Sequence, residues 1–255
     1  VQQAVEEHLR FEALEKELAI AAEIQTSMLP QDFALDDRLD IAARMQAARH
    51  VGGDFYDVYR INDRTVYAAI GDVAGKGIPA ALFVVKAMTI LRNEMMKQLP
   101  VHSAMAALNR ALCKGNDRCM FVTIAIVVID TVTGDCRYVS AGHNPAALGR
   151  PGRDFAFLAP PGGILTGIDE GAVYEAVDLR LEVGTTLLLY TDGVTEAMDP
   201  DHALFGEKRM LDCLNRHSVE TASGVTRRIR EAVEGFTGDA PQSDDLTLVA
   251  VRRVG

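Results

Sequence analysis

The chain has 255 residues, and its 26 Lys and Arg against 36 Asp and Glu give a formal net charge of −10. A hydrophobic fraction of 48% and a charged fraction of 24% are typical of a globular protein with one large core, and they exclude long disorder and fibrous repeats. The acid surplus argues against electrostatic binding to nucleic acid, which requires a face rich in Lys and Arg.

The first 28 residues predict a helix that Pro30 ends. Its apolar stripe fits either a helix packed on its own domain or, as we favour, a parallel coiled coil that forms a homodimer and links an upstream sensor or receiver module. The start at Val1, within the helical pattern, favours a longer protein. We therefore divide the chain into a linker helix, 1–28, and a main domain, 29–255. The stripe consists of Phe11, Leu14, Leu18, Ala21, Gln25 and Met28.

After Pro30 the pattern changes to short strands that come in hairpin-linked groups, with helices inserted in two pairs. This order favours an α+β architecture of antiparallel sheets covered by helices, because a parallel sheet requires strict alternation of strands and helices. The expected strands are 39–47, 55–61, 65–70, 121–129, 136–140, 173–181, 185–190 and 246–252, with short strands and loops in 145–167; the expected helices are 78–98, 102–114, 207–215 and 219–234.

The cysteines and the lengths of the apolar runs indicate where in the cell the protein is located. Cys113, Cys119, Cys136 and Cys213 form no Cys-x-x-Cys pair, so we expect neither a zinc cluster nor a disulfide framework. The longest apolar run is too short to span a bilayer, and the N-terminus lacks a signal-peptide pattern. These features predict a cytoplasmic protein without membrane insertion.

The positions of four aspartates are more informative than the number of acids. Asp54, Asp72, Asp192 and Asp244 each lie at the predicted end of an apolar strand beside turn-forming residues, and strand ends present side chains to a shared cleft. Taken singly, each is compatible with ordinary turn chemistry. If the four converge, they require a cation to stay ionised, and an all-oxygen set selects Mg²⁺ or Mn²⁺ over Zn²⁺.

Five motifs in order then resemble the metal-dependent PPM protein phosphatases, also called type 2C, and in particular the bacterial branch that controls stress and sporulation sigma factors. The segment 22–30 also resembles the linker that precedes the domain in that branch. The motifs are Val51-Gly-Gly-Asp-Phe-Tyr-Asp57, Ile70-Gly-Asp-Val-Ala-Gly-Lys-Gly-Ile-Pro-Ala80, Ser140-Ala-Gly-His-Asn-Pro145, Leu189-Tyr-Thr-Asp-Gly-Val-Thr-Glu-Ala197 and Ser243-Asp-Asp-Leu-Thr-Leu248.

The resemblance implies an αββα sandwich of two antiparallel sheets flanked by helices, with a centre of two divalent cations, Mn²⁺ or Mg²⁺. By this resemblance Asp72 would bridge the cations and the Val73 carbonyl would be a further ligand. Asp192 and Asp244 would hold one cation, and Asp54 would hold the other directly or through water. Asp245 is an alternative or outer ligand, since sequence does not rank it against Asp244. We expect Asp72 and Asp54 to be the catalytic residues that support attack of metal-bridged water on a phosphoserine or phosphothreonine.

Two departures from eukaryotic members concern leaving-group protonation and phosphate binding. Those members place a His two residues after the bridging Asp, where this chain has Ala74, and they carry a phosphate-binding Arg near the N-terminus for which no equivalent is evident. His143 is a tempting substitute acid, but we interpret it as a residue that structures the loop Gly142-His143-Asn144-Pro145.

Family analogy also suggests the partner, a phosphorylated anti-sigma-factor antagonist of the STAS type, and regulation through the N-terminal helix. The helix expected at 78–98 directly follows the Asp72 loop, so a shift of that helix would move a metal ligand. The alternative is a phosphatase-like adaptor or dimerisation domain without turnover. The spacing of 71–77 does not fit a P-loop, 52–55 lacks an acid of the diguanylate cyclase motif, and no Gly-x-Ser-x-Gly elbow is present.

Overall fold

The computed structural model describes residues 2–216 and 221–255. The helices are α1 (Gln2–Met28), α2 (Ile78–Met96), α3 (Val101–Cys113), α4 (Asp192–Thr195), α5 (Gly206–Asn215) and α6 (Ala222–Thr237). The strands are β1 (Leu39–Gln46), β2 (Asp54–Asn62), β3 (Thr65–Val73), β4 (Val122–Asp130), β5 (Asp135–Ala141), β6 (Ala147–Gly149), β7 (Ala156–Phe157), β8 (Ala176–Arg180), β9 (Thr186–Tyr190) and β10 (Leu246–Arg253).

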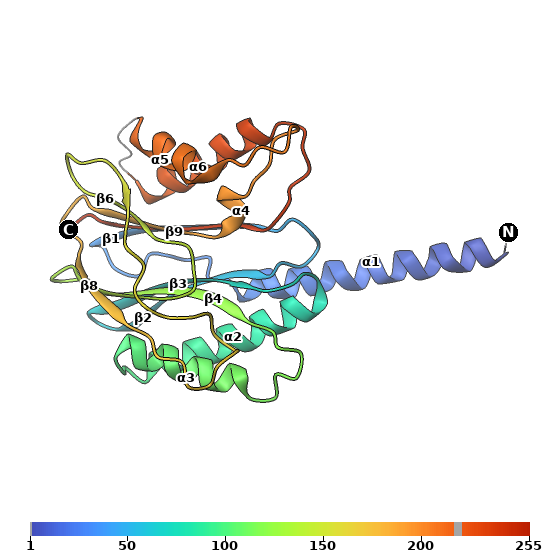
Figure 1. The fold of residues 1–255 in the computed structure, drawn as a ribbon, viewed down its shortest axis with the longest axis horizontal. Helices are drawn as coiled ribbons and strands as arrows, with labels where there is room; N and C mark the ends of the chain where they lie inside the picture. The colour runs from blue at the N-terminus through green and yellow to red at the C-terminus, as the bar shows by residue number, and fades with distance from the viewer. Residues whose placement is uncertain (1, 217–220) are drawn as a thin grey trace.

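The strands form two five-stranded sheets packed face to face. One sheet has the order β1-β10-β9-β6-β7 and the other β2-β3-β4-β5-β8, and all their pairings are antiparallel. Helices α5 and α6 cover the outer face of the first sheet, and α2 and α3 cover the second (Figure 1). The predicted αββα sandwich is therefore confirmed.

Both faces of the first sheet are buried, which explains why its central strands are almost wholly apolar. In β10, Val249 and Val251 join the core between the sheets, whereas Leu248 and Ala250 join a second core under α5 and α6. Successive strand residues point to opposite faces, so each core receives every second residue.

The observed elements match the predicted ones to within a few residues, with three differences. β3 continues through Asp72 to Val73, so that Asp72 lies in the strand and pairs with Thr123 of β4. The short helix α4 was not predicted, because four residues are too few to show a helical pattern. The predicted start of the last helix at Val219 lies outside the described residues, and α6 is observed from Ala222.

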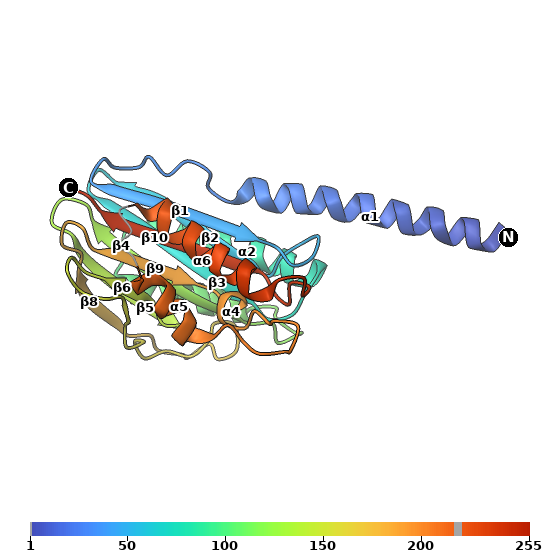
Figure 2. The same ribbon diagram turned by 90° about the horizontal axis from the view of Figure 1, so that it is seen from above.

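Helix α1 extends away from the sandwich and touches it near its C-terminal end (Figures 1 and 2). The chain that follows α1 is anchored on the domain: Leu29 is buried in the core, and the Tyr56 hydroxyl donates a hydrogen bond of 3.1 Å to the Pro30 carbonyl. Within the described residues, no helix combines the length and apolar content needed to cross a membrane.

Candidate metal centre

Asp54 and Asp72 lie directly opposite each other, at the start of β2 and near the end of β3. Directly opposed residues of an antiparallel pair project from the same face of the sheet, about 5 Å apart at Cβ. Phe55 and Gly71 form the neighbouring pair. Glycine is required at position 71 because a Cβ there would lie 2.6 Å from the Phe55 ring. The amide of Val73 donates a hydrogen bond of 3.0 Å to the Gly53 carbonyl and closes this end of the ladder.

Asp192 and Asp244 reach the same place from the other sheet. Asp192 begins α4 directly after β9, and Asp244 lies just before β10, the strand that pairs with β9. Gly193 makes the contact possible, because a Cβ at this position would lie 1.9 Å from the Asp245 carbonyl oxygen. The topology thus brings all four predicted aspartates to one edge of the sandwich.

Two threonine hydroxyls orient the Asp54 carboxylate. Thr191 and Thr247 donate hydrogen bonds of 2.7 and 2.5 Å to its Oδ2, and both threonines are fully buried. Burial and the neighbouring charge of Asp72 nevertheless raise the pKa of Asp54 well above its usual range. The hydroxyl contacts therefore position this carboxylate without replacing the positive charge that would keep it ionised.

The same shortage of positive charge affects Asp72 and Asp192. Burial, together with the charges of Asp192, Asp244 and Asp245, raises the pKa of Asp72 to about 7. Burial, Glu196 and Asp244 raise the pKa of Asp192. Asp72, Asp192 and Asp244 therefore lie near enough for the charge of one carboxylate to affect the ionisation of another.

The structure distinguishes the adjacent Asp244 and Asp245. The buried Asp245 carboxylate accepts hydrogen bonds from three backbone amides: Ala48 at 2.8 Å, Gly53 at 2.6 Å and Asp54 at 3.4 Å. It thus holds the loop that leads into β2. The Asp244 side chain is 41% exposed; its Oδ1 accepts a hydrogen bond from the Asp245 amide and its Oδ2 lies 2.8 Å from the Lys76 ammonium.

Among the described residues, Lys76 is the cation that forms an ion pair with one of these carboxylates. Besides its ion pair with Asp244, its Nζ donates a hydrogen bond of 2.9 Å to the Ser243 carbonyl, and its charge partly offsets the rise in the pKa values of Asp72 and Asp192. Lys76 comes from the loop between β3 and α2, so it spans the two sheets at the edge where the aspartates gather.

The donor set fits hard divalent cations. The convergent groups are carboxylates, with no His or Cys among them, and such oxygen ligands favour Mg²⁺ and Mn²⁺. Burial and neighbouring carboxylates raise the pKa values of Asp54, Asp72 and Asp192, as expected where too little positive charge faces them. Within the described residues, no three acidic, His or Cys groups already surround one point as metal ligands do.

His143 is a structural residue of this edge, as the sequence predicted. It is buried; its Nε2 donates to the Tyr190 carbonyl at 3.1 Å, and its Nδ1 lies 2.9 Å from the Thr123 hydroxyl. Burial lowers the pKa of His143 to about 4. Both ring nitrogens are occupied and the ring is neutral, so this side chain is not placed to deliver a proton to a leaving group.

Sequence reasoning did not assign roles to Lys76, Thr191 and Thr247, although all three lie within the quoted motifs. Their positions were the available signal: Thr191 immediately precedes Asp192, Thr247 is the second residue of the last strand, and Lys76 follows Asp72 by four residues. Their long-range partners depend on the pairing of β9 with β10, which the motifs alone do not reveal.

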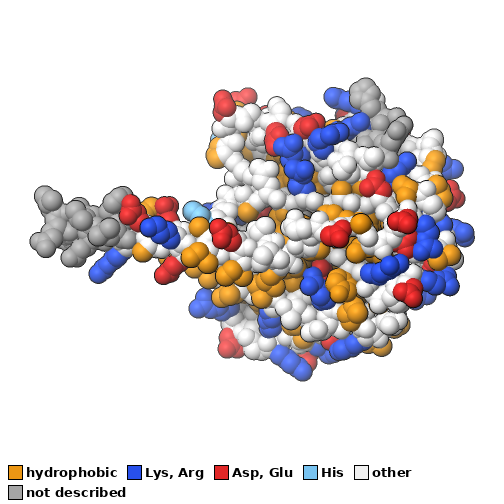
Figure 3. Space-filling view, turned by 180° about the vertical axis from the view of Figure 1, so that it is seen from behind, with side chains coloured by type: hydrophobic (Ala, Val, Ile, Leu, Met, Phe, Trp, Pro, Cys, Tyr) orange, Lys and Arg blue, Asp and Glu red, His pale blue; other side chains and the backbone are white. Residues whose placement is uncertain are grey.

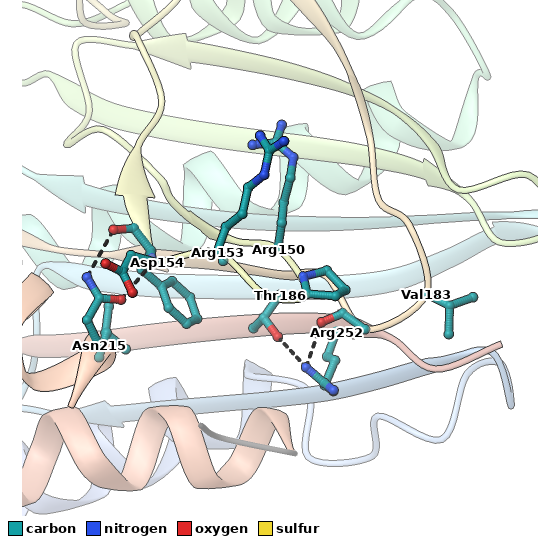
Figure 4. A pocket seen from close by; sticks show the side chains of 13 residues that line it. Arg150, Arg153, Asp154, Val183, Thr186, Asn215 and Arg252 are labelled. Carbon is teal, nitrogen blue, oxygen red and sulfur yellow. Dashed lines mark hydrogen bonds between the residues drawn. The ribbon is translucent and has the colours of Figure 1, made fainter. Parts of the chain in front are cut away.

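A cavity of about 580 Å³ lies away from the aspartates, between the loop after β6 and the ends of β9 and β10 (Figure 4). Arg150 and Arg153 extend side by side in one direction, while Arg252 lies apart and donates to the Gly184 carbonyl and the Thr186 hydroxyl. These arginines do not converge on one position. None of the predicted site residues lines this cavity.

Comparison with known proteins gives a consistent result. Residues 62–254 match the family model described as stage II sporulation protein E (SpoIIE). The chain is 27% identical over 258 residues to phosphoserine phosphatase RsbU of Bacillus subtilis, covering 98% of this chain and 75% of RsbU. It is also 27% identical over 266 residues to protein IcfG of Synechocystis, covering 93% of this chain but 41% of IcfG.

Solved structures share the fold. The SiaA-PP2C domain of Pseudomonas aeruginosa superposes with a TM-score of 0.82 at 22% identity, covering 95% of this chain and 98% of that domain. The catalytic domain of the serine/threonine phosphatase PstP, solved in complex with two manganese ions, gives a TM-score of 0.60 at 17% identity, covering 85% of this chain and 99% of that domain.

Proposed function

This chain belongs to the SpoIIE family of phosphatase domains, and from that premise we propose that it is a metal-dependent protein serine/threonine phosphatase. The observation that carries the proposal is the convergence of four aspartates from four distant segments at the positions of the family motifs, with the pKa values of Asp54, Asp72 and Asp192 raised. RsbU, which matches along 98% of this chain, is named a phosphoserine phosphatase.

The residues take separate roles in this proposal. Asp54, Asp72, Asp192 and Asp244, with the Val73 carbonyl, would hold two divalent cations, and Asp72 would be the ligand that the two cations share. Bound Mn²⁺ or Mg²⁺ would supply Lewis-acid activation of water and neutralise the phosphoryl oxygens. Asp245 positions the loop before β2 and is not a direct ligand, because three backbone amides already bond to its carboxylate.

The substrate in this proposal is a phosphoserine or phosphothreonine on a regulatory protein, and a STAS-type anti-sigma-factor antagonist fits the branch that RsbU and SpoIIE represent. The chain's own groups bear on how the phosphate is held. Lys76 is 42% exposed at the rim of the aspartate edge and is the candidate to contact the phosphoryl oxygens, since His143 is buried and occupied.

Regulation is part of the proposal. Residues 1–28 act as a linker helix that joins the phosphatase domain, 29–255, to an upstream sensor or receiver module and forms a homodimer. The support is the apolar surface on α1, where Ile20 and Ile24 are more than half exposed, and the gathering of apolar side chains where α1 joins the domain (Figure 3). A cytoplasmic location fits the four free thiols.

The test is hydrolysis of p-nitrophenyl phosphate with Mn²⁺ by the wild type and by Asp72→Asn. We expect the substitution to lower kcat/KM by roughly 10²- to 10³-fold, because it removes the charge shared by both cations. Equal rates in the two proteins would favour the alternative, an adaptor or dimerisation domain without turnover.

A further inference from the structure

Gln25 connects helix α1 to the loop that carries Asp54. Its buried side-chain amide makes two hydrogen bonds with the backbone of Gly52: Nε2 donates to the Gly52 carbonyl at 2.7 Å, and Oε1 accepts from the Gly52 amide at 3.0 Å. Both halves of the amide are used. An apolar side chain at this position would leave two buried backbone groups without these partners, and such groups are costly to leave unpaired.

The segment 52–54 is confined on its other sides as well. A Cβ on Gly52 would lie 2.5 Å from the Met45 side chain and 2.8 Å from the Asp245 carboxylate, and a Cβ on Gly53 would lie 2.9 Å from the Val73 carbonyl oxygen. Asp245 binds the amides of Gly53 and Asp54. The backbone before Asp54 is therefore fixed on one side by Asp245, which belongs to the sandwich, and on the other side by Gln25, which belongs to α1.

We propose that Gln25 is a positioning residue for Asp54: through the Gly52 backbone it fixes the place from which the Asp54 carboxylate meets a metal ion. This inference rests on the proposed function. Gln25 lies close to the C-terminal end of α1. The part of the helix on its N-terminal side projects from the domain (Figure 2). Asp54 thus depends on a contact from the part of the chain outside the sandwich, whereas Asp192 and Asp244 lie within loops of the sandwich itself.

The experiment measures Mn²⁺ affinity by calorimetry for Gln25→Leu, with Gln31→Leu as the matched control. Gln31 is exposed in the segment after α1, and its amide donates a single long hydrogen bond of 3.4 Å to the Leu29 carbonyl. Loss of a residue that orients a metal ligand typically weakens metal binding 10- to 100-fold. We expect at least a tenfold rise in the Kd of Gln25→Leu and less than a twofold change in the control.

A double-mutant cycle with Asp54→Asn separates positioning from general destabilisation. If Gln25 acts through Asp54, adding Gln25→Leu to Asp54→Asn causes no further loss of Mn²⁺ affinity. A loss of the same size in both backgrounds would overturn the inference, as would an unchanged Kd for the folded single variant. If circular dichroism shows Gln25→Leu unfolded, Gln25→Asn, whose amide is one methylene too short, replaces it in the cycle.

The two proposals fail differently. If the wild type binds Mn²⁺ and Asp54→Asn weakens that binding while Gln25→Leu does not, the phosphatase proposal stands and the role of Gln25 is wrong. If the wild type shows no Mn²⁺ binding that depends on Asp54, the proposed function fails and this inference fails with it.

Discussion

Strand β2 carries two buried aspartates, Asp54 and Asp57, whose surroundings differ. Residues three apart point to opposite faces of a strand, so Asp54 faces the other sheet and Asp57 faces α2. Asp57 is paired with a cation: Arg92 of α2 donates to its Oδ1 at 2.5 Å and its Oδ2 at 3.2 Å, and the Tyr67 hydroxyl donates a further hydrogen bond. Asp54 has two hydroxyl donors and faces another carboxylate.

This difference separates an acid that serves the fold from one available for chemistry. A buried carboxylate paired with an arginine is neutralised within the protein and has no need of a ligand. Asp54 and its neighbour Asp72 instead have raised pKa values. The repulsion between their charges destabilises the metal-free fold, and only protonation or added cations relieve it. Burial of an aspartate therefore says less about function than the charge of its nearest partner.

The strongest test of the comparison removes the arginine. Arg92→Met leaves the fully buried Asp57 without its cation, so we expect the free energy of unfolding to fall by about 3–5 kcal/mol. In the contrasting variant, Asp54→Asn, removal of one of the repelling charges should raise the stability of the metal-free protein. Urea unfolding in EDTA measures both. A loss of stability in both variants would show that Asp54, like Asp57, stabilises the metal-free fold.

Some of this contrast could be predicted from the sequence and some could not. The positions of Asp54, Asp72, Asp192 and Asp244 at strand ends pointed to one edge, because an apolar run and its flanking glycines are local signals. The roles of Asp244 and Asp245 could not be ranked. Neighbouring residues face different directions, and only the pairing of β10 with its neighbours decides which one meets the loop before β2.

Gln25 illustrates a second limit. The spacing of α1 placed it on the same stripe as Phe11 and Leu14, which favoured a coiled-coil seam. In the structure Phe11 and Leu14 are exposed, whereas Gln25 is buried against the Gly52 backbone. A contact between a side chain and the backbone of a distant loop leaves no periodic signal, so sequence spacing indicates the face of a helix but not what covers it.

A second test concerns His143, whose lowered pKa gives a definite pH dependence. Above pH 6.5 the imidazole is neutral in both states; as the pH falls, the unfolded chain binds a proton and the folded one resists until about pH 4. We therefore expect His143 to cost about 3 kcal/mol of stability between pH 7 and pH 4. Unfolding by urea across this range should show a smaller loss in His143→Asn than in the wild type.

Subtracting the two pH curves isolates the imidazole, because the raised pKa values of the acidic edge change stability in the opposite direction over the same range. Parallel curves for wild type and His143→Asn would mean that His143 is accessible to protons in the folded state, and it would then return as a candidate acid.

The smallest expected effect concerns Lys76. Its ion pair with Asp244 resembles the pairing of Arg92 with Asp57. Its ammonium lies 2.8 Å from Asp244 Oδ2, and the other oxygen of Asp244 already accepts the Asp245 amide. A metal ion that uses Oδ2 must displace Lys76. Because a half-exposed ion pair contributes only about 0.2–1 kcal/mol, Lys76→Met should tighten Mn²⁺ binding by roughly two- to fivefold. Weaker Mn²⁺ binding in this variant would show that Lys76 supports the metal site. Tighter Mn²⁺ binding, together with a raised inhibition constant for inorganic phosphate, would show that Lys76 binds the phosphate group of the substrate.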